Sequence, residues 1–240
     1  MLNKLDSHSF LTACFLLSLS SPAVSSIINE VEPNNPITPS FIETAYNIDP
    51  YFSSEFNADI GDISGNNISD NSSHVSINGT GDGSFDYYSF TITSAGLTGI
   101  FDIDYGSGSG GSVDTEISLW NDKGTVLRIN DDYSSTAGAG GSTSSLDSFM
   151  QYDFLEAGIY IIGVAEYNSN AGTTGWTGNV LDQLDTYTLH VALGTGFSTT
   201  PSTPIPNVPV PPALYLFLSG ILSIVGFGKY QKNILKKITS

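Results

Sequence analysis

Alternation of apolar and polar residues is the clearest pattern in this chain, and it becomes regular from Asp86 onward. Within residues 97–105, Leu97, Phe101, Ile103 and Tyr105 face one way, while Asp102 and Asp104 face the opposite way. This period of two is typical of a half-buried strand. Similar runs recur at the spacing of about ten residues that β-sandwiches show. They predict strands over 87–92, 97–105, 116–120, 125–129, 148–154, 159–165 and 186–193.

The segments between these runs carry turn and loop signals. The Asn-Asp-Lys-Gly sequence at 121–124 predicts a hairpin turn. Residues 41–78 are rich in Asn, Ser and Asp, and predict only short strands. The Gly/Ser tracts at 106–112 and 134–145 predict loops that do not pack a core. Because the run at 159–165 is apolar on both faces, we expect a central strand there. The fold class that follows is all-β, an antiparallel jelly-roll-like β-sandwich over 26–195.

The N-terminal residues predict a signal peptide over 1–25. Lys4 precedes an apolar stretch, and Ala23-Val-Ser25 provides the small residues that signal peptidase requires. Cys14, the only cysteine, resembles a lipidation site only superficially, because polar residues rather than an apolar core precede it. Cleavage after Ser25 leaves a chain without cysteine, so no disulfide stabilises the domain.

The C-terminal residues 208–240 predict a membrane-directed segment that follows a Pro/Thr/Ser linker over 196–207. From Val208 to Gly228 the chain has no charge, and about 20 such residues cross a bilayer as a helix. Four lysines follow, at 229, 232, 236 and 237, which places the C-terminus on the cytoplasmic side and the domain outside. We therefore expect one transmembrane helix and an exported domain.

The charge of the domain restricts its partners. The chain has 24 acidic residues and 7 Lys or Arg, and between residues 26 and 207 the only basic residues are Lys123 and Arg128. A surface this acidic repels nucleic acid and anionic membrane surfaces. Two explanations stay open: the acidity keeps an exported protein soluble, or some of the carboxylates bind a divalent cation.

With the strands placed, the domain resembles the bacterial pre-peptidase C-terminal domain, a β-sandwich of exported proteins. The resemblance covers about 30–193 and rests on the segments Glu-Pro-Asn-Asn at 32–35, Asp-Tyr-Tyr-Ser-Phe at 86–90, 117–124, Ile-Asn-Asp-Asp at 129–132, Leu-Asp-Ser at 146–148, 157–164 and 187–191. The long segment between Asn35 and Asp82 and the enlarged Gly/Ser loops depart from this pattern, which leaves the first strands open.

The tail resembles a PEP-CTERM-type sorting signal in its Val-Pro-x-Pro variant. The motif residues are Val208, Pro209, Val210, Pro211, Pro212 and Ala213. The resemblance implies that an exosortase-like membrane enzyme is a partner. It also implies that the protein is held in the inner membrane before processing and is then released to the cell surface or the exterior. A permanent single-pass anchor is the alternative.

Some relatives of the pre-peptidase domain bind calcium, and the resemblance implies which residues do so here. The implied ligands are Glu30, Glu32, Asn34 and Asn35 of the N-terminal segment, together with Asp82 and Asp86. Carboxylate and amide oxygens are the ligands that Ca²⁺ prefers. The alternative is a solvated acidic leader with an Asx-type turn. A second acidic group, Asn130, Asp131, Asp132 and Asp147, is better explained as a turn whose side chains bond their own backbone.

Catalytic signatures are missing from the sequence. No Gly-x-Ser-x-Gly elbow, nucleophilic Cys or zinc-spaced His pair occurs after the signal, so we predict that the protein is not an enzyme. Trp120 lies in a strand and is expected in the core. Trp176, in a Gly/Thr-rich loop, is expected to expose its ring and is the candidate for stacking on a sugar. The function expected is a structural or adhesive protein of the surface or extracellular matrix, with binding of extracellular polysaccharide as the alternative.

Overall fold

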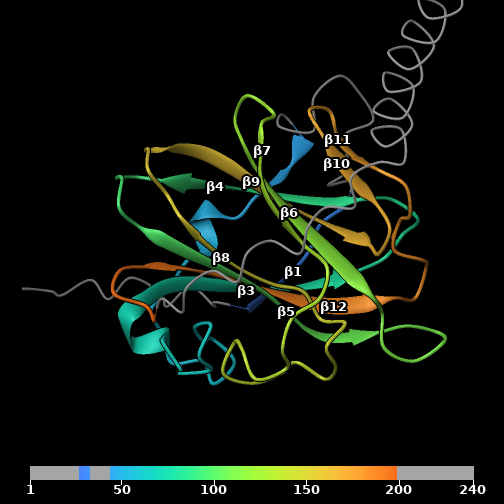
Figure 1. Ribbon diagram of the computed structural model, residues 1–240, viewed down its shortest axis with the longest axis horizontal. Coiled ribbons are helices and arrows are strands. Elements are labelled where there is room, and N and C mark those ends of the chain that lie inside the picture. The colour runs from blue at the N-terminus through green and yellow to red at the C-terminus, as the bar shows by residue number, and fades with distance from the viewer. Residues whose placement is uncertain (1–26, 33–43, 199–240) are drawn as a thin grey trace, which may run out of the picture. The chain divides into compact units, whose positions relative to one another are not determined.

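The computed structural model describes residues 27–32 and 44–198, and ten of its strands form two stacked five-stranded sheets (Figure 1). The first sheet has the order β1-β3-β12-β5-β8, with bounds β1 Ile27–Asn29, β3 Ser72–Thr80, β12 Thr186–Gly194, β5 Thr98–Ser107 and β8 Phe149–Asp153. The second has the order β2-β4-β9-β6-β7, with bounds β2 Tyr46–Asn47, β4 Asp86–Ile92, β9 Gly158–Glu166, β6 Thr115–Asn121 and β7 Val126–Asn130. Two short 3₁₀ helices, η1 Asp49–Tyr51 and η2 Ser69–Asn71, and the hairpin of β10 Asn170–Gly172 and β11 Gly175–Thr177 complete the described elements.

Successive long strands cross between the two sheets, as in a jelly roll. From β3 to β9 the chain changes sheet at every connection except the β6–β7 hairpin, whose turn is the predicted one at 121–124. The pairs within each sheet are antiparallel, apart from two short parallel edge pairs, β1 with β3 and β2 with β4. The prediction of an all-β sandwich is confirmed, and β9 is the central strand that its apolar faces indicated.

The main core lies between the sheets and follows the alternation that the sequence displays. Phe101 and Ile103 of β5 are completely buried there, against residues such as Phe90 and Leu189. A smaller apolar cluster lies on the outer face of the first sheet, where Ile100 and Phe149 contact Ile60 and Ala137 of the covering loops. Figure 1 shows these loops, before β3 and between β7 and β8, below that sheet. The first sheet is therefore buried on both faces over much of its width.

Two sequence predictions are wrong because both faces of the first sheet are buried. Strand β3, nine residues long, lies where only short strands were expected. Its inward residues Val75 and Ile77 are apolar, but its outward residues His74 and Ser76 are buried under a loop, and so it lacks a clear sandwich-strand pattern. The Gly/Ser tract 134–145 was expected not to pack a core, yet its Ala137 is 2% exposed because the small residues allow close approach to the sheet.

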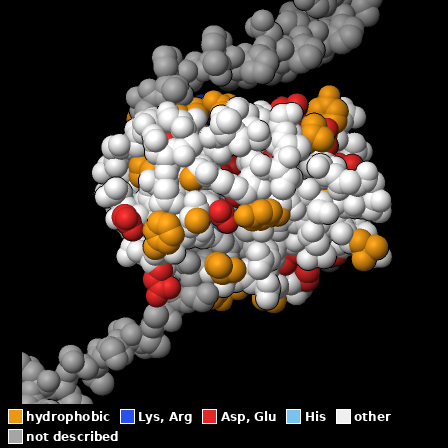
Figure 2. Space-filling view, turned by 90° about the horizontal axis from the view of Figure 1, so that it is seen from below, with side chains coloured by type: hydrophobic (Ala, Val, Ile, Leu, Met, Phe, Trp, Pro, Cys, Tyr) orange, Lys and Arg blue, Asp and Glu red, His pale blue; other side chains and the backbone are white. Residues whose placement is uncertain are grey.

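The predicted signal peptide 1–25 and the sorting tail 208–240 lie outside the described residues. Within the part of the chain that the structure describes, no helix is long and apolar enough to cross a membrane. On the face shown in Figure 2, hydrophobic and acidic side chains are scattered among uncharged ones and form no large apolar patch.

Candidate metal centre

Three carboxylates gather where the N-terminal segment meets the start of β4. Glu30 directly follows β1 and its backbone N–H donates to Asn78 O of β3 at 3.1 Å. Asp86 is the first residue of β4 in the other sheet. One carboxylate oxygen from each of Glu30, Glu32 and Asp86 lies within 4.8 Å of the other two. The group thus bridges the two sheets, with Glu32 exposed, Glu30 half-buried and Asp86 fully buried.

Two buried tyrosines form hydrogen bonds with these carboxylates. The Tyr88 hydroxyl donates to Glu30 Oε2 at 2.7 Å, and the Tyr187 hydroxyl donates to Asp86 Oδ2 at 2.6 Å. The two hydroxyl oxygens are also 2.7 Å apart. The backbone N–H of Thr80 donates to Glu30 Oε1. These contacts fix the orientation of Glu30 and Asp86, and they tie β1, β4 and β12 together.

The hydrogen-bond chain through the tyrosines requires one more hydrogen than the hydroxyls supply. Each tyrosine has a single hydroxyl hydrogen, but three contacts connect Glu30, Tyr88, Tyr187 and Asp86. A protonated Asp86 would provide the third hydrogen by donating to Tyr187. When Glu30 and Asp86 are both ionised, the Tyr88–Tyr187 contact has no hydrogen.

The surroundings of Asp86 disfavour its ionised form. Burial raises the pKa of Asp86 well above its usual range, and the nearby charges of Glu30, Glu32 and Asp82 raise it further, against the opposing hydrogen bond from Tyr187. Asp86 Oδ1 is buried and accepts no hydrogen bond. Hard oxygen ligands, an excess of negative charge and a buried oxygen without a partner all fit a calcium ion. The residues present therefore suit the cation that the sequence resemblance implied.

Among the described residues, the other calcium ligands that the resemblance implied are not part of this group. Asp82 is exposed and adds its charge to the surroundings of Asp86, but it does not belong to the compact group of three. Asn34 and Asn35 lie outside the described residues. Sequence reasoning did not identify Tyr88 and Tyr187 as part of the site, because as alternating strand residues they look like ordinary core residues.

The raised carboxyl pKa values predict an unusual pH dependence of stability. Burial raises the pKa of Glu116 from 4.5 to about 7 and contributes to a pKa of about 6 for Asp114, and the pKa of Asp86 is also raised. A carboxyl whose pKa is higher in the folded protein than in the unfolded chain binds protons more readily in the folded state. Its contribution to the free energy of unfolding is therefore greatest at pH values below the unfolded-state pKa, and it is lost as the pH rises through the folded-state pKa. In chelator, we expect the free energy of unfolding to fall between about pH 4.5 and pH 7.

Urea unfolding in chelator at a series of pH values measures this trend. A free energy of unfolding that rises over the same interval would show that these carboxyls are ionised at no cost in the folded protein.

The expectation of an exposed Trp176 ring is wrong. Trp176 is 5% exposed, and its ring meets that of Trp120 edge to face at a centroid distance of 5.5 Å. The β10–β11 hairpin folds back over the outer face of the second sheet, and Tyr87 accordingly lies against the same cluster. Since stacking on a sugar needs an accessible ring face, Trp176 is not available for it. Trp120 is completely buried, as expected.

The second acidic group is a set of turns, as the sequence favoured. Asp131 Oδ1 accepts the Asp132 backbone N–H at 2.9 Å. Asp147 Oδ2 accepts the backbone N–H groups of Thr143 and Ser144 at 2.6 and 3.2 Å. These bonds fix the backbone of the loop before β8.

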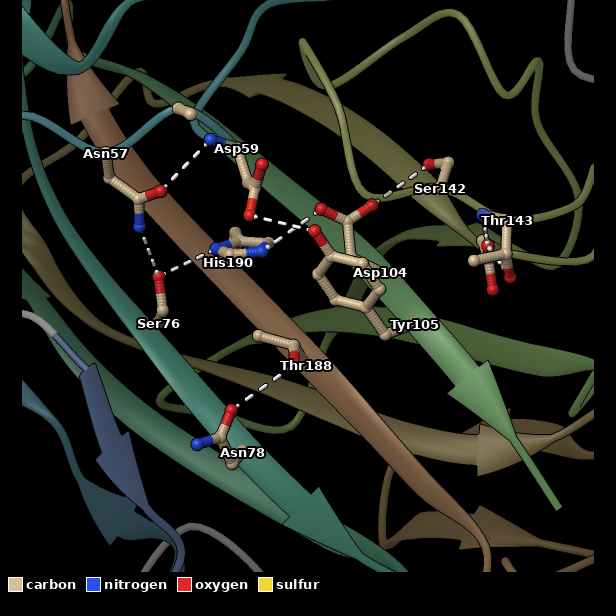
Figure 3. Close-up of polar contacts among 12 residues, drawn as sticks. Asn57, Asp59, Ser76, Asn78, Asp104, Tyr105, Ser142, Thr143, Thr188 and His190 are labelled. Carbon is tan, nitrogen blue, oxygen red and sulfur yellow. Dashed lines mark hydrogen bonds and ion pairs between the residues drawn. The ribbon is translucent and has the colours of Figure 1, made fainter.

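The structure also contains a buried Ser-His-Asp line across three strands that the sequence did not suggest (Figure 3). The Ser76 hydroxyl of β3 lies 2.7 Å from His190 Nδ1 of β12, and His190 Nε2 lies 3.1 Å from Asp104 Oδ2 of β5. All three side chains are at most 3% exposed, beneath the covering loops. A substrate cannot reach a serine buried in this way, so the line acts as a structural link between adjacent strands.

No family model matches the sequence, and no curated protein matches it. Among solved structures, the pre-peptidase C-terminal domain of a collagenase from Bacillus anthracis is similar, with 16% identity, a TM-score of 0.31, and coverage of 49% of this chain and 88% of that one. PliG of Aeromonas hydrophila, a periplasmic inhibitor of g-type lysozyme, is similar at 19% identity with a TM-score of 0.29, covering 51% of this chain and 86% of that one. At this level the two likenesses assign the chain neither a family nor a function.

Proposed function

We propose that this protein is an exported, non-enzymatic β-sandwich with a structural or adhesive role at the cell surface or in the extracellular matrix, and that calcium fastens its N-terminal segment. The observation that carries the calcium part is the group of Glu30, Glu32 and Asp86 around the unpartnered Asp86 Oδ1. An ion held by these residues joins one sheet, through Glu30, to the other, through Asp86.

The physical effect of such an ion is to secure the edge of the sandwich. Strand β1 is three residues long, and among the described strands it pairs with β3 alone, so its own hydrogen bonds hold it weakly. A cation that binds Glu30 and Glu32 adds attraction at the residues directly after the strand. A domain tightened in this way suits a location outside the cell, where the calcium concentration is high enough for a site of modest affinity.

Hydrogen exchange of the full-length chain tests this role. In calcium, we expect slow exchange in the peptide that covers 27–32 and at the Thr80 N–H, which donates to Glu30. In chelator both should exchange markedly faster, whereas the central strand β9 should change little. Equal exchange rates at 27–32 in calcium and in chelator would contradict the proposal.

The route to the surface rests on the tail motif rather than on the folded domain. We propose that an exosortase-like enzyme recognises Val208 to Ala213 and processes the membrane-held protein. Replacing Pro209, Pro211 and Pro212 by Ala should leave the unprocessed form in the membrane fraction. Unchanged processing of that variant would favour a plain anchor.

Glycan binding is the second candidate function, at a position other than Trp176. A cavity of about 300 Å³ opens between the β6–β7 turn and the β8–β9 connection, and Tyr152, Tyr160, Asn121 and Lys123 line it. Tyrosine rings beside amide and charged groups suit a sugar, and this volume is at the small end for a ligand site. Calorimetric titration with a panel of neutral and acidic oligosaccharides should then give an affinity that Tyr152→Ala weakens. Absence of binding across the panel would dispose of this candidate.

A further inference from the structure

The side chain of Asp102 is buried without a hydrogen bond on the outer face of the first sheet. It is 1% exposed, and neither of its carboxylate oxygens has a hydrogen-bond partner among the described residues. Gly138 of the loop 134–145, between β7 and β8, lies directly against it, so closely that a Cβ atom there would overlap Asp102 Oδ2. Burying an unpaired charge costs far more free energy than burying the neutral acid. The closed loop therefore favours the protonated form of Asp102.

The acidic groups around Asp102 add to this preference. Burial raises the pKa of Asp102 well above its usual range, and the charges of Asp104 on the same strand, Asp147 before β8 and Asp59 before β3 raise it further. Asp62 lies in the same loop as Asp59, and its carboxylate accepts backbone N–H groups of its own turn. Ionisation of Asp102 thus adds a negative charge to a region that is already acidic.

The strands on either side of Asp102 do not pair with its charge. On β12 its register partner is His190, but His190 Nε2 approaches Asp104 Oδ2 at 3.1 Å instead. On β8 its register partner is Phe149, which is apolar. An ionised Asp102 can therefore be hydrated only if the loop above it moves away.

The loop 134–145 is held closed by few contacts. Ala137 is its only buried side chain. Gly141 O accepts the Tyr105 backbone N–H of β5 at a rather long 3.3 Å. Ala139 has a φ of 75°, a left-handed conformation that costs free energy for a residue with a Cβ atom. A segment with so little apolar burial opens at a lower cost than the strands beneath it.

We propose that the loop 134–145 is a pH-dependent lid, closed over protonated Asp102 and opened when Asp102 ionises. Opening lets water reach the carboxylate. It also uncovers part of the outer apolar cluster, in which Ile100 and Phe149 are at most 3% exposed while the lid is closed. The lid contains none of the three proposed calcium ligands, so its opening and calcium binding are tested separately.

The direction of the pH effect follows from the environment of Asp102 in the two forms. Its pKa is higher beneath the closed lid than in water, so the closed form binds the proton more tightly. As the pH rises from the pKa of the open form to that of the closed form, the ratio of open to closed lid increases by up to about tenfold per pH unit.

Hydrogen exchange of the full-length protein in chelator measures this ratio, after correction for the intrinsic pH dependence of amide exchange. From about pH 5 to about pH 8, the Tyr105 N–H and the peptide that covers 134–145 should lose protection by up to about tenfold per pH unit. Asp102→Asn cannot ionise and should show the same protection at every pH. Asp70→Asn, which removes an exposed carboxylate on η2, should follow the wild type.

Gly138→Ala provides a second variant in case Asp102→Asn does not fold. Gly138 has a φ of 80°, and the added Cβ would overlap Asp102 Oδ2, so the lid should be unprotected at every pH while circular dichroism shows an unchanged β-sheet spectrum. Gly110→Ala is the matched control, because a Cβ there meets no atom within 4 Å. Wild-type protection that is constant with pH, or that falls equally in Asp102→Asn, would overturn the proposal, and so would a fully protected lid in Gly138→Ala.

Discussion

Replacing Trp120 by Ala is expected to lower the free energy of unfolding by about 3–5 kcal/mol, the usual cost of removing a fully buried tryptophan. The ring is completely buried, lies 5.9 Å from Tyr87 and 5.5 Å from Trp176 between ring centroids, and donates its Nε1–H to Gly172 O at 2.9 Å. Its loss leaves a cavity under the β10–β11 hairpin and an acceptor without its donor.

Urea unfolding followed by circular dichroism measures this loss. The matched control is Leu155→Ala, since Leu155 is 81% exposed and its truncation should change stability by no more than about 0.5 kcal/mol. Equal stability of Trp120→Ala and the wild type would mean that the hairpin does not pack on the second sheet.

Calcium binding is expected to produce the second largest change in the stability of the folded protein. A ligand at 100 times its dissociation constant that binds only the folded state stabilises it by about 2.7 kcal/mol. For a domain of this size that corresponds to a rise in Tm of roughly 5–10 °C. Asp86→Asn should remove the response of the Glu30–Glu32–Asp86 site, because Asp86 provides its buried ligand oxygen.

The same variant separates a metal ligand from an ordinary structural residue. Asparagine keeps an acceptor for the Tyr187 hydroxyl and removes the charge that Glu30, Glu32 and Asp82 repel. In chelator at pH 8, Asp86→Asn should therefore be at least as stable as the wild type, although it gains less from calcium. A variant that is less stable in chelator and gains as much as the wild type from calcium would contradict this assignment.

Much of the fold could be predicted from the sequence because the core between the sheets imposes a period of two. Phe101 and Ile103 face that core, and β5 was accordingly predicted to within two residues at each end. The outer face of the first sheet could not be predicted, since burial beneath loops leaves no periodic signal. His74, Ser76, Asp102 and Asp104 look like solvent-facing residues, and only the three-dimensional structure reveals the loops above them.

The candidate site, too, could be predicted from the sequence only in part. The acidic residues were identifiable because Glu30, Glu32 and Asp86 match a known pattern, and the structure brings these three together. Tyr88 and Tyr187, 99 positions apart in the sequence, meet only because β4 and β12 lie in facing sheets. Trp176 was misjudged because its Gly/Thr-rich surroundings suggested an open loop, whereas a short hairpin folds the ring onto the second sheet.

Calorimetric calcium titration of the full-length protein, compared with Asp86→Asn, decides whether Glu30, Glu32 and Asp86 bind calcium. We expect saturable binding that Asp86→Asn reduces by one ion, with proton release from the wild type that shows as a dependence of the heat on the ionisation enthalpy of the buffer. That release reflects the raised pKa of Asp86. If Asp86→Asn binds calcium as the wild type does, Glu30, Glu32 and Asp86 are not a calcium site, and the acidity of this end of the sandwich serves only solubility.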